Sequence, residues 1–465
     1  MVDFSTILQT AEVRAIVQER ALERAFHDAL FPLLLFRSEA NPVEWPQGVG
    51  DSYIATAPGL LANSMGALRP GVDPTPQSYA IEQWEASLNQ YAGTIDTHMP
   101  TSAQAIVDLF MRNAQQLGMQ AARSVNALVR NRMFNAAEAG NGVVDGAQVG
   151  STSVRVKRLN GFTRARNPLI TGASKVRFDT VSGANPLRVS VAGVANTVIG
   201  YTPDVAGDEF GPGVLTMSVA VTCADRAYIK SYDCSKVIRV GGGNSVNDID
   251  PTDLPRLESL RAVVADLKKN NVPKHLDGLY HMHLEPESVS AFYADQELQR
   301  LHTGVPDAYS YKEMALGVFF GVIFVENNEV PLPTNVGSHD GVTSDQDDNF
   351  AGEFYSTGVA TGTPIHRALV TGHGGIFEFY QDPANFLTEA GMIGHAGPVQ
   401  VSNNGIELMA DRITMVLRSP LNRLQDVVAA SWKFLGDWPV RTDAATGDDS
   451  RYKRFRIVQH AVQGT

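Results

Sequence analysis

The sequence predicts a mixed α+β fold, and three stretches of the chain carry this prediction. Residues 41–100 are rich in Pro and Gly and contain no lysine and no helical period. Residues 101–139 then form the longest helical pattern in the sequence. Residues 141–247 alternate short strand-like runs with Gly, Pro and Asn turns, which is the pattern of an all-β module. A long loop beside one very long helix indicates a subunit that reaches over its neighbours, because such loops are uncommon in compact domains and usually functional.

Composition limits the class of protein. The chain has 465 residues, of which 43% are hydrophobic and 19% charged, enough for two or three domains with sizeable cores. Its net charge of −12 argues against a broad nucleic-acid-binding face, which needs clustered Lys and Arg. Cys223 and Cys234 are the only cysteines, so a disulfide scaffold or a cysteine-rich zinc module is excluded. We expect both to be buried thiols in a reducing environment.

Targeting signals are also missing from the sequence. No apolar run approaches the length of a membrane span. The first twenty residues have acids where a signal peptide would have basic residues. We therefore expect the chain to fold in the cytoplasm and to have no membrane partner.

The first hundred residues divide into three parts. Residues 6–35 have a loose apolar stripe and predict a helix; it either packs on its own core as an ordinary amphipathic helix or forms an arm that docks on a neighbour. Residues 39–77 hold six prolines and several glycines, which predict an extended loop or an irregular two-stranded excursion. Residues 79–99 are strand-like.

The long helix has a defined start, stripe and end. Thr101 and Gln104 form a capping box after a proline, and Gly140 supplies a stop. At 1.5 Å per residue the helix would be about 55–60 Å long. Its apolar stripe consists of Ile106, Phe110, Ala114, Leu117, Ala121, Val125 and Leu128. Its polar face, suited to solvent or to another subunit, consists of Arg112, Gln116, Arg123, Arg130 and Asn131.

The rest of the chain mixes helices and strands. Thr252 or Asp253 is expected to cap a helix over residues 254–270. Residues 316–326 predict a buried strand pair or a bent strand, and residues 368–380 predict another. Further strands are predicted at residues 278–284 (GLYHMHL), 412–418, 427–434 and 452–459.

The sequence contains no recognisable catalytic motif. The sequence contains no nucleophile elbow, no P-loop and no zinc-protease motif. His281 and His283 alternate beside Glu285 without a further evident ligand, so no metal site is predicted. Residues 372–375 (GHGG) predict a bulge within a strand. We assign no catalytic residue, no cofactor and no metal ligand, and we expect the chain not to be an enzyme.

An acidic segment imitates a calcium loop. Counting from Asp345, however, Phe350 stands where glycine is needed and Ser356 where the final glutamate is needed. A solvated loop is therefore expected there.

Charge is distributed unevenly along the sequence. Residues 151–190 hold eight basic residues and one acid, whereas residues 336–357 hold five acids and no Lys or Arg. Two interpretations stay open: solvated strand edges, or complementary patches on adjoining subunits. Aromatic and leucine side chains of the long loop also need cover. The residues predicted to lie between subunits are Trp45, Tyr53, Leu60, Leu61, Arg164, Arg166, Asp345 and Asp347.

The order of these parts resembles a tailed-bacteriophage major capsid protein of the Hong Kong 97-like fold family. Residues 88–100 (LNQYAGTIDTHMP) resemble the strand that leads from that family's extended loop into its spine helix. Residues 274–295 (KHLDGLYHMHLEPESVSAFYAD) and 315–331 (ALGVFFGVIFVENNEVP) resemble its axial domain. Residues 411–440 and 451–457 (RYKRFRI) resemble its closing strands.

The resemblance implies a division of the chain into six parts. These are an N-terminal arm (1–40), an extended loop (41–95), a peripheral domain (96–144) with the spine helix (101–139), an inserted β-rich domain (145–247), an axial domain (248–400) and the closing strands (401–465).

The resemblance also implies a function. Hexamers and pentamers of one chain would close into an icosahedral shell around double-stranded DNA, which they would enclose without sequence-specific binding. Portal, scaffolding and decoration proteins would be further partners, and the chain would be found in the virion and, during assembly, in the host cytoplasm. An acidic chain suits this role, since a lining that bound DNA tightly would hinder packaging.

One departure and two alternatives qualify the resemblance. In the type member a loop lysine forms an isopeptide bond with a neighbour, but the first lysine here is Lys157, so non-covalent overlap or a decoration protein must stabilise the shell. An encapsulin-like compartment would share the fold. A carbohydrate-binding or adhesive protein would instead make the β-rich domain the functional module.

Overall fold

The computed structural model describes most of the chain between residues 35 and 462. The described residues are 35–46, 50–59, 61, 63–67, 71, 73–74, 76–98, 106–167, 175–302, 317–331, 356, 362–381, 399–402, 405–410, 412–418, 427–443 and 451–462. The predicted N-terminal helix up to residue 34, the capping box of the long helix, Leu60, Asp345 and Asp347 lie outside them.

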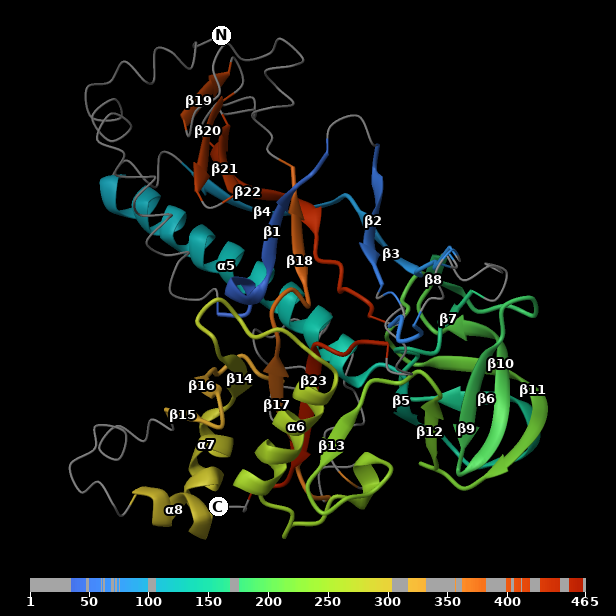
Figure 1. Ribbon diagram of the computed structural model, residues 1–465. Helices are drawn as coiled ribbons and strands as arrows, with labels where there is room; N and C mark the ends of the chain where they lie inside the picture. The colour runs from blue at the N-terminus through green and yellow to red at the C-terminus, as the bar shows by residue number, and fades with distance from the viewer. Residues whose placement is uncertain are drawn as a thin grey trace. The chain divides into compact units, whose positions relative to one another are not determined.

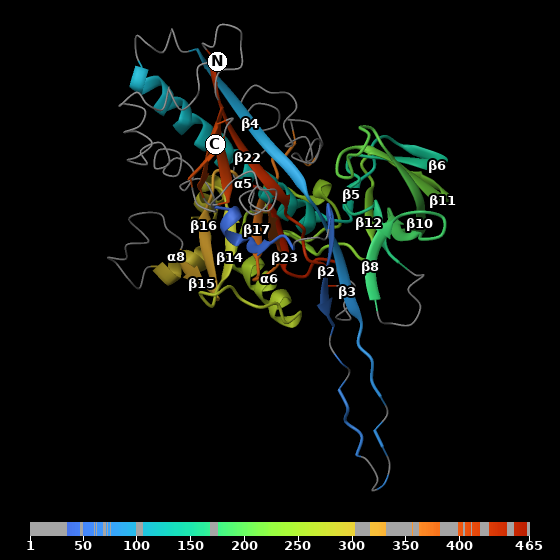
Figure 2. The same ribbon diagram turned by 90° about the horizontal axis from the view of Figure 1, so that it is seen from above.

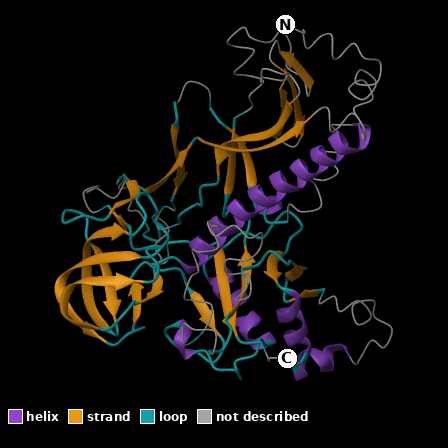
Figure 3. Ribbon diagram, turned by 180° about the vertical axis from the view of Figure 1, so that it is seen from behind, coloured by secondary structure: helices purple, strands orange, loops and turns teal. Residues whose placement is uncertain are grey.

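Strands dominate the described residues, together with one long helix and a few short ones (Figure 3). The predicted α+β class is therefore confirmed. No helix in the described ranges is long and apolar enough to span a membrane.

The chain forms two compact units, each built from segments that are far apart in the sequence. Unit 1 comprises Met1–Tyr53, Glu85–Arg130 and Ile376–Pro439, and unit 2 comprises Ile54–Trp84, Asn131–Gly375 and Val440–Thr465.

A seven-stranded sheet forms the centre of unit 1. Its strands are β1 (Asn41–Glu44), β18 (Phe377–Tyr380), β22 (Val427–Asp437), β21 (Ile413–Arg418), β20 (Gly405–Ala410) and β19 (Val399–Ser402) in that order, with β4 (Asn89–His98) also paired to β22. The longest ladder is antiparallel and runs from Val427 opposite His98 to Gly436 opposite Asn89. β19 and β20 were not predicted from the sequence, whereas β21 and β22 were.

The long helix α5 (Ile106–Glu138) contacts this sheet through polar side chains. Asn113 Nδ2 donates to Thr97 Oγ1 of β4 at 2.7 Å, and Trp432 Nε1 of β22 donates to Gln120 Oε1 at 3.4 Å. Gly93 of β4 must remain glycine, because a Cβ there would lie 2.6 Å from Trp432 Nε1. A close approach of helix and sheet thus depends on one missing side chain.

The predicted apolar stripe of α5 is confirmed at four of its described side chains, whereas Leu128 is only half-buried. Ala114, Leu117, Ala121 and Val125 are 0–1% exposed, whereas Arg123 is exposed. The predicted polar face is wrong at its end, because Asn131 is only 4% exposed. From Asn131 onward the helix belongs to unit 2 and is buried on nearly all sides, so a 3.6-residue period no longer separates two faces there. Gly140, with φ of 74°, supplies the predicted stop.

Exchanging neighbouring residues of α5 should show which face carries its stability. Leu117→Ala should lower the free energy of unfolding of the subunit by about 2–5 kcal/mol, because it leaves a cavity under the sheet. Gln116→Ala, on the exposed face, should change it by less than about 0.5 kcal/mol. Urea unfolding of unassembled subunits measures both values, and equal losses would contradict this helix register.

Unit 2 contains a six-stranded β-module, shown in green in Figure 1. Its strands, in sheet order, are β5 (Asn141–Val143), β12 (Tyr228–Ser231), β9 (Leu187–Val191), β10 (Val194–Pro203), β11 (Gly213–Cys223) and β6 (Gln148–Val156). All but β5 and β10 correspond to strand-like runs of the sequence or their edges. The sequence hides β10 because Ala192 and Gly193, both with positive φ, turn the chain in two residues within one apolar run.

A second sheet of unit 2, which we call the mixed sheet, contains parallel and antiparallel pairs. Its strands, in order, are β13 (Val237–Arg239), β23 (Phe455–His460), β17 (His366–Thr371), β14 (Tyr280–Leu284), β16 (Val322–Glu326) and β15 (Val318–Phe319). The helices α6 (Leu257–Lys269), α7 (Pro286–Tyr293) and α8 (Gln296–His302) belong to the same unit. Leu260, Val264, Met282, Phe292 and Val370 form part of the shared core.

The structure tests two sequence predictions in this region, the start of a helix and a strand pair. Helix α6 starts at Leu257 with Arg256 as its N-cap, and not at Thr252 or Asp253. The cause is Pro255, which disfavours a helical conformation of the residue before it. The strand pair predicted at residues 316–326 is observed as the hairpin β15–β16, but the prediction that it is buried is wrong, because Val318 is 51% exposed and only Val322 is buried.

Residues 368–380, in contrast, do not form one strand or one strand pair. Strand β17 lies in the mixed sheet and β18 in the sheet of unit 1. The predicted strand bulge at residues 372–375 is instead the turn between them. Gly372 N donates to Arg454 O, and His373 N donates to Pro273 O, so this turn is bound to other segments of unit 2.

Candidate functional site

A two-stranded arm is the most exposed part of the described chain. Strands β2 (Ser52–Pro58) and β3 (Ile81–Ser87) belong to a four-stranded sheet with β8 (Lys175–Thr180) and β7 (Arg164–Arg166). Figure 2 shows β2 and β3 side by side, with the chain continuing beyond them as two extended segments. Gly59 N donates to Ala80 O at 2.7 Å at the point where these segments begin. Of the two forms predicted for this stretch, the two-stranded one is therefore observed.

Apolar side chains on this arm lack cover from the described residues. Every described residue from 61 to 79 is exposed. Leu61 is 54% exposed and Met65 is 91% exposed, while Ile54 on β2 is 42% exposed. Apolar groups exposed together along an extended segment indicate a contact surface for another chain.

Trp45 and Tyr53, also predicted to face a neighbour, lie in an aromatic cluster of unit 1. Trp45 is 5% exposed, and its Nε1 donates to Gly50 O at 3.1 Å. Its ring centroid lies 6.2 Å from that of Tyr53 and 6.1 Å from that of Phe379. Phe379 of β18 thus provides the cover that the sequence pattern assigned to another subunit.

The basic strands do not form the uncompensated patch that the sequence suggested. Arg164 Nε lies 3.1 Å from Glu209 Oε2, and Arg155 lies 3.1 Å from Asp145 and 2.5 Å from Asp204. Arg166 is exposed. Further pairs join Lys157 to Asp145, Arg158 to Glu138 and Arg177 to Asp179.

The compensating acids explain why the sequence window was misleading. Four of the five, Glu138, Asp145, Asp204 and Glu209, lie outside residues 151–190. Over residues 141–231 as a whole, ten basic and six acidic residues give a net charge of +4. The acidic segment proposed as the counterpart lies outside the described residues.

A buried ionic junction, which the sequence analysis missed, closes the C-terminal end of α5. Glu138 accepts from Arg158 Nη1 at 2.6 Å, from Arg367 Nε at 2.7 Å and from Gln459 Nε2 at 2.7 Å. The three charged side chains are 0–2% exposed. Burial alone would raise the pKa of Glu138, but Arg367 and Arg158 lower it to about 2. The junction therefore joins the end of the helix to the β-module and to strands β17 and β23.

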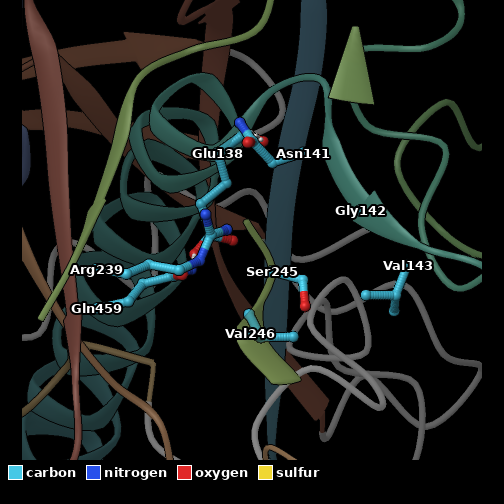
Figure 4. A pocket seen from close by; sticks show the side chains of 8 residues that line it. All are labelled: Glu138, Asn141, Gly142, Val143, Arg239, Ser245, Val246 and Gln459. Atoms are coloured by element: carbon cyan, nitrogen blue, oxygen red, sulfur yellow. Dashed lines mark hydrogen bonds between the residues drawn. The ribbon is translucent and has the colours of Figure 1, made fainter. Parts of the chain in front are cut away.

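A cavity of about 10 Å³ lies beside the junction. In Figure 4, Arg239 and Gln459 extend toward Glu138. The lining residues are Glu138, Asn141, Gly142, Val143, Arg239, Ser245, Val246 and Gln459. This volume is about that of one water molecule, so the junction is a structural centre and not a substrate pocket.

A second buried ion pair lies in unit 1. Arg37 donates to Glu378 of β18 through Nε at 2.9 Å and through Nη2 at 2.7 Å. The backbone N–H groups of Phe36 and Arg37 donate to Asn126 Oδ1 of α5 at 2.8 and 3.2 Å. Residues 36–37 are thereby fixed to both the helix and the sheet of their own unit.

The contact between Ser288 and His460 has to be assessed as a possible catalytic pair. Ser288 Oγ lies 3.2 Å from His460 Nε2 and donates to Glu285 Oε1 at 2.9 Å. All three residues are 0% exposed. Burial, and then His366, lower the pKa of His460 to about 3, which makes it a weak base at neutral pH. The contact lacks both access for a substrate and an effective general base.

The remaining sequence candidates have ordinary surroundings. His281 Nε2 lies 2.9 Å from Asp277 Oδ2, whereas His283 is buried. Cys223 and Cys234 are half-buried rather than fully buried, and burial raises the pKa of both thiols. A raised pKa keeps a thiol protonated and unreactive at neutral pH.

Comparison with known proteins gives similar structures but no similar sequences. No protein-family model matches the chain, and no curated protein matches it. The capsid of the cyanophage P-SCSP1u is similar over 92% of this chain and 88% of its own, with 12% identity and a TM-score of 0.48. The capsid of the cyanophage Pam1 is similar over 94% and 93%, with 10% identity and a TM-score of 0.47.

An encapsulin is also among the similar structures. The SrpI encapsulin of Synechococcus elongatus is similar over 94% of this chain and 90% of its own, with 10% identity and a TM-score of 0.39. The first two are phage capsids, and the third is an encapsulin.

Proposed function

We propose that this chain is the major capsid protein of a tailed bacteriophage and assembles without catalysis into an icosahedral shell. The observation that carries the proposal is the exposed arm, on which Leu61 and Met65 are uncovered while the charged groups at the end of α5 are paired within the chain. A subunit with an uncovered apolar arm can hide that arm by laying it on another copy.

The charge of the chain supports the same role. A net charge of −12 disfavours tight binding of DNA, and a shell that encloses packaged DNA benefits from a lining that does not hold it. Self-association into hexamers and pentamers, portal, scaffolding and decoration partners, and location in the virion after assembly in the host cytoplasm all form part of this proposal.

A ligand-binding function of the β-module is the second candidate. A hollow of about 520 Å³ on this module is lined by residues that include Thr180, Ser182, Tyr201 and Asp208. Asp208 Oδ1 already accepts from Phe210 N and Gly211 N, so one carboxylate oxygen of the hollow is used for its own loop. The shell function therefore has the better support.

Electron microscopy of the expressed full-length chain tests the proposal. We expect closed shells of uniform size, because another copy can cover the exposed arm. Nucleic acid released from shells formed during infection, rather than cargo protein, would separate a capsid from an encapsulin-like compartment. Discrete small particles under all assembly conditions, with or without the neighbouring gene products, would contradict the shell function and favour the β-module candidate.

A further inference from the structure

Three potential metal ligands meet at the end of the mixed sheet. One ligand atom from each of Glu285, Glu287 and His366 lies within 4.8 Å of the other two. Glu285 is the N-cap of α7, Glu287 lies in its first turn, and His366 begins β17. Strands β14 and β17 are antiparallel, so the residue that follows β14 lies beside the first residue of β17.

The carboxylate of Glu285 is only partly satisfied by the described residues. Its side chain is 0% exposed. Oε1 accepts a hydrogen bond from Ser288 Oγ at 2.9 Å and contacts His366 Nδ1. Oε2 is buried and has no hydrogen-bond partner among the described residues. A buried polar atom without a partner costs about 1–3 kcal/mol, and more when its group is charged. A bound cation would remove this cost.

The identity of the three ligands indicates the kind of cation. We propose that Glu285, Glu287 and His366 bind one divalent transition-metal ion, with Zn²⁺ and Mn²⁺ as the ions to test. An imidazole nitrogen suits Zn²⁺ and related metals, and carboxylate oxygens bind both Zn²⁺ and Mn²⁺.

The surroundings of the three ligands suit such an ion. The Ser288 hydroxyl orients Glu285, as hydrogen bonds around metal sites commonly do. Glu287 is exposed, so an ion can enter from solvent and water can complete its coordination. The ion would tie the start of α7 to β17 and thereby stabilise the mixed sheet. This site would exist whether or not the chain forms shells.

Metal titration of the untagged full-length chain tests the site. Protein stripped with EDTA would be titrated with Zn²⁺ alone and with Mn²⁺ alone by calorimetry, and bound metal would be counted by elemental mass spectrometry. We expect one ion per chain for at least one of the two metals. Glu287→Gln should weaken its binding about tenfold or more, and should reduce the rise in Tm at a fixed metal concentration.

A matched control keeps this result specific. Glu258 is likewise an exposed glutamate in the first turn of a helix, α6, so Glu258→Gln should leave affinity and Tm unchanged. Because Glu287 is exposed, Glu287→Gln should fold normally, which circular dichroism verifies. If neither metal binds, or if Glu287→Gln binds as tightly as the unchanged chain, Glu285 and His366 form only a hydrogen-bonded pair and the proposal is overturned.

Discussion

Chains that lack residues 60–79 should fold as subunits but fail to close into shells. Gly59 and Ala80 are hydrogen-bonded neighbours, so an Asn-Gly turn can join them without straining β2 and β3. The deleted residues that are described are all exposed, and their loss should therefore leave the unfolding midpoint of the subunit nearly unchanged. Shell assembly should be lost, because the apolar arm no longer reaches a neighbour. Microscopy and sedimentation measure assembly, and urea unfolding measures stability.

A milder variant separates the apolar side chains from the backbone of the arm. The pair Leu61→Ser and Met65→Ser should reduce the yield of shells strongly, since it removes apolar surface that another copy would cover. Val149→Ser with Val205→Ser is the matched control, because these residues are 85% and 64% exposed on the β-module. Normal shells from the chain that lacks residues 60–79 would refute the role of the arm. An equal loss of shells in both serine pairs would show that any exposed apolar pair has this effect, and not the arm in particular.

Replacing Glu138 by alanine should destabilise the subunit by about 3–5 kcal/mol, the usual cost of removing one partner from a buried charge cluster. Arg158 and Arg367 would be left buried without their shared carboxylate. Glu258→Ala, on an exposed helix position, should change stability by less than about 0.5 kcal/mol. Urea unfolding of unassembled subunits measures both variants, and similar losses would mean that the junction contributes nothing special.

The same carboxylate should make the subunit sensitive to acid. Its pKa is about 2 in the folded chain, compared with 4.5 for an ordinary glutamate side chain. Because the folded pKa is depressed, the stabilisation is complete above pH 4.5 and is lost as the pH falls toward 2. It amounts to about 3 kcal/mol. Unfolding midpoints across this range should fall less steeply for Glu138→Gln than for the unchanged chain, and parallel slopes would contradict the assigned pKa.

Local patterns predicted those elements whose side chains alternate regularly between core and solvent. The stripe of α5 was predictable because Leu117, Ala121 and Val125 repeat with the helical period and face one core. Strands β6, β9 and β11 were predictable because apolar residues alternate along them. Two of the predictions that failed did so at turns. Pro255 precedes the actual start of α6, and the two-residue turn at Ala192 and Gly193 divides one apolar run into β9 and β10.

The site could not be predicted in the same way, because its parts meet only after folding. Glu138 and Arg367 are 229 residues apart, and no period or motif links them. Counting charges within residues 151–190 suggested a basic patch, yet Glu209 and Asp204 neutralise Arg164 and Arg155 from outside that window. Trp45 likewise looked uncovered because Phe379, which covers it, lies more than three hundred positions later in the sequence.

The seven-stranded sheet and the mixed sheet can be completed only after β22 and β23 have been synthesised. Strand β23 lies between β13 and β17 in the mixed sheet, and all six of its residues are buried, although it ends five residues before the end of the sequence. In unit 1, β4 pairs with β22, which follows it by more than three hundred residues. At typical elongation rates, synthesis of 465 residues takes roughly 20–90 s. For part of that time β4 waits for β22 and β17 waits for β23, with strand edges open to other chains. The nascent chain is therefore the state that needs protection from aggregation, before assembly begins.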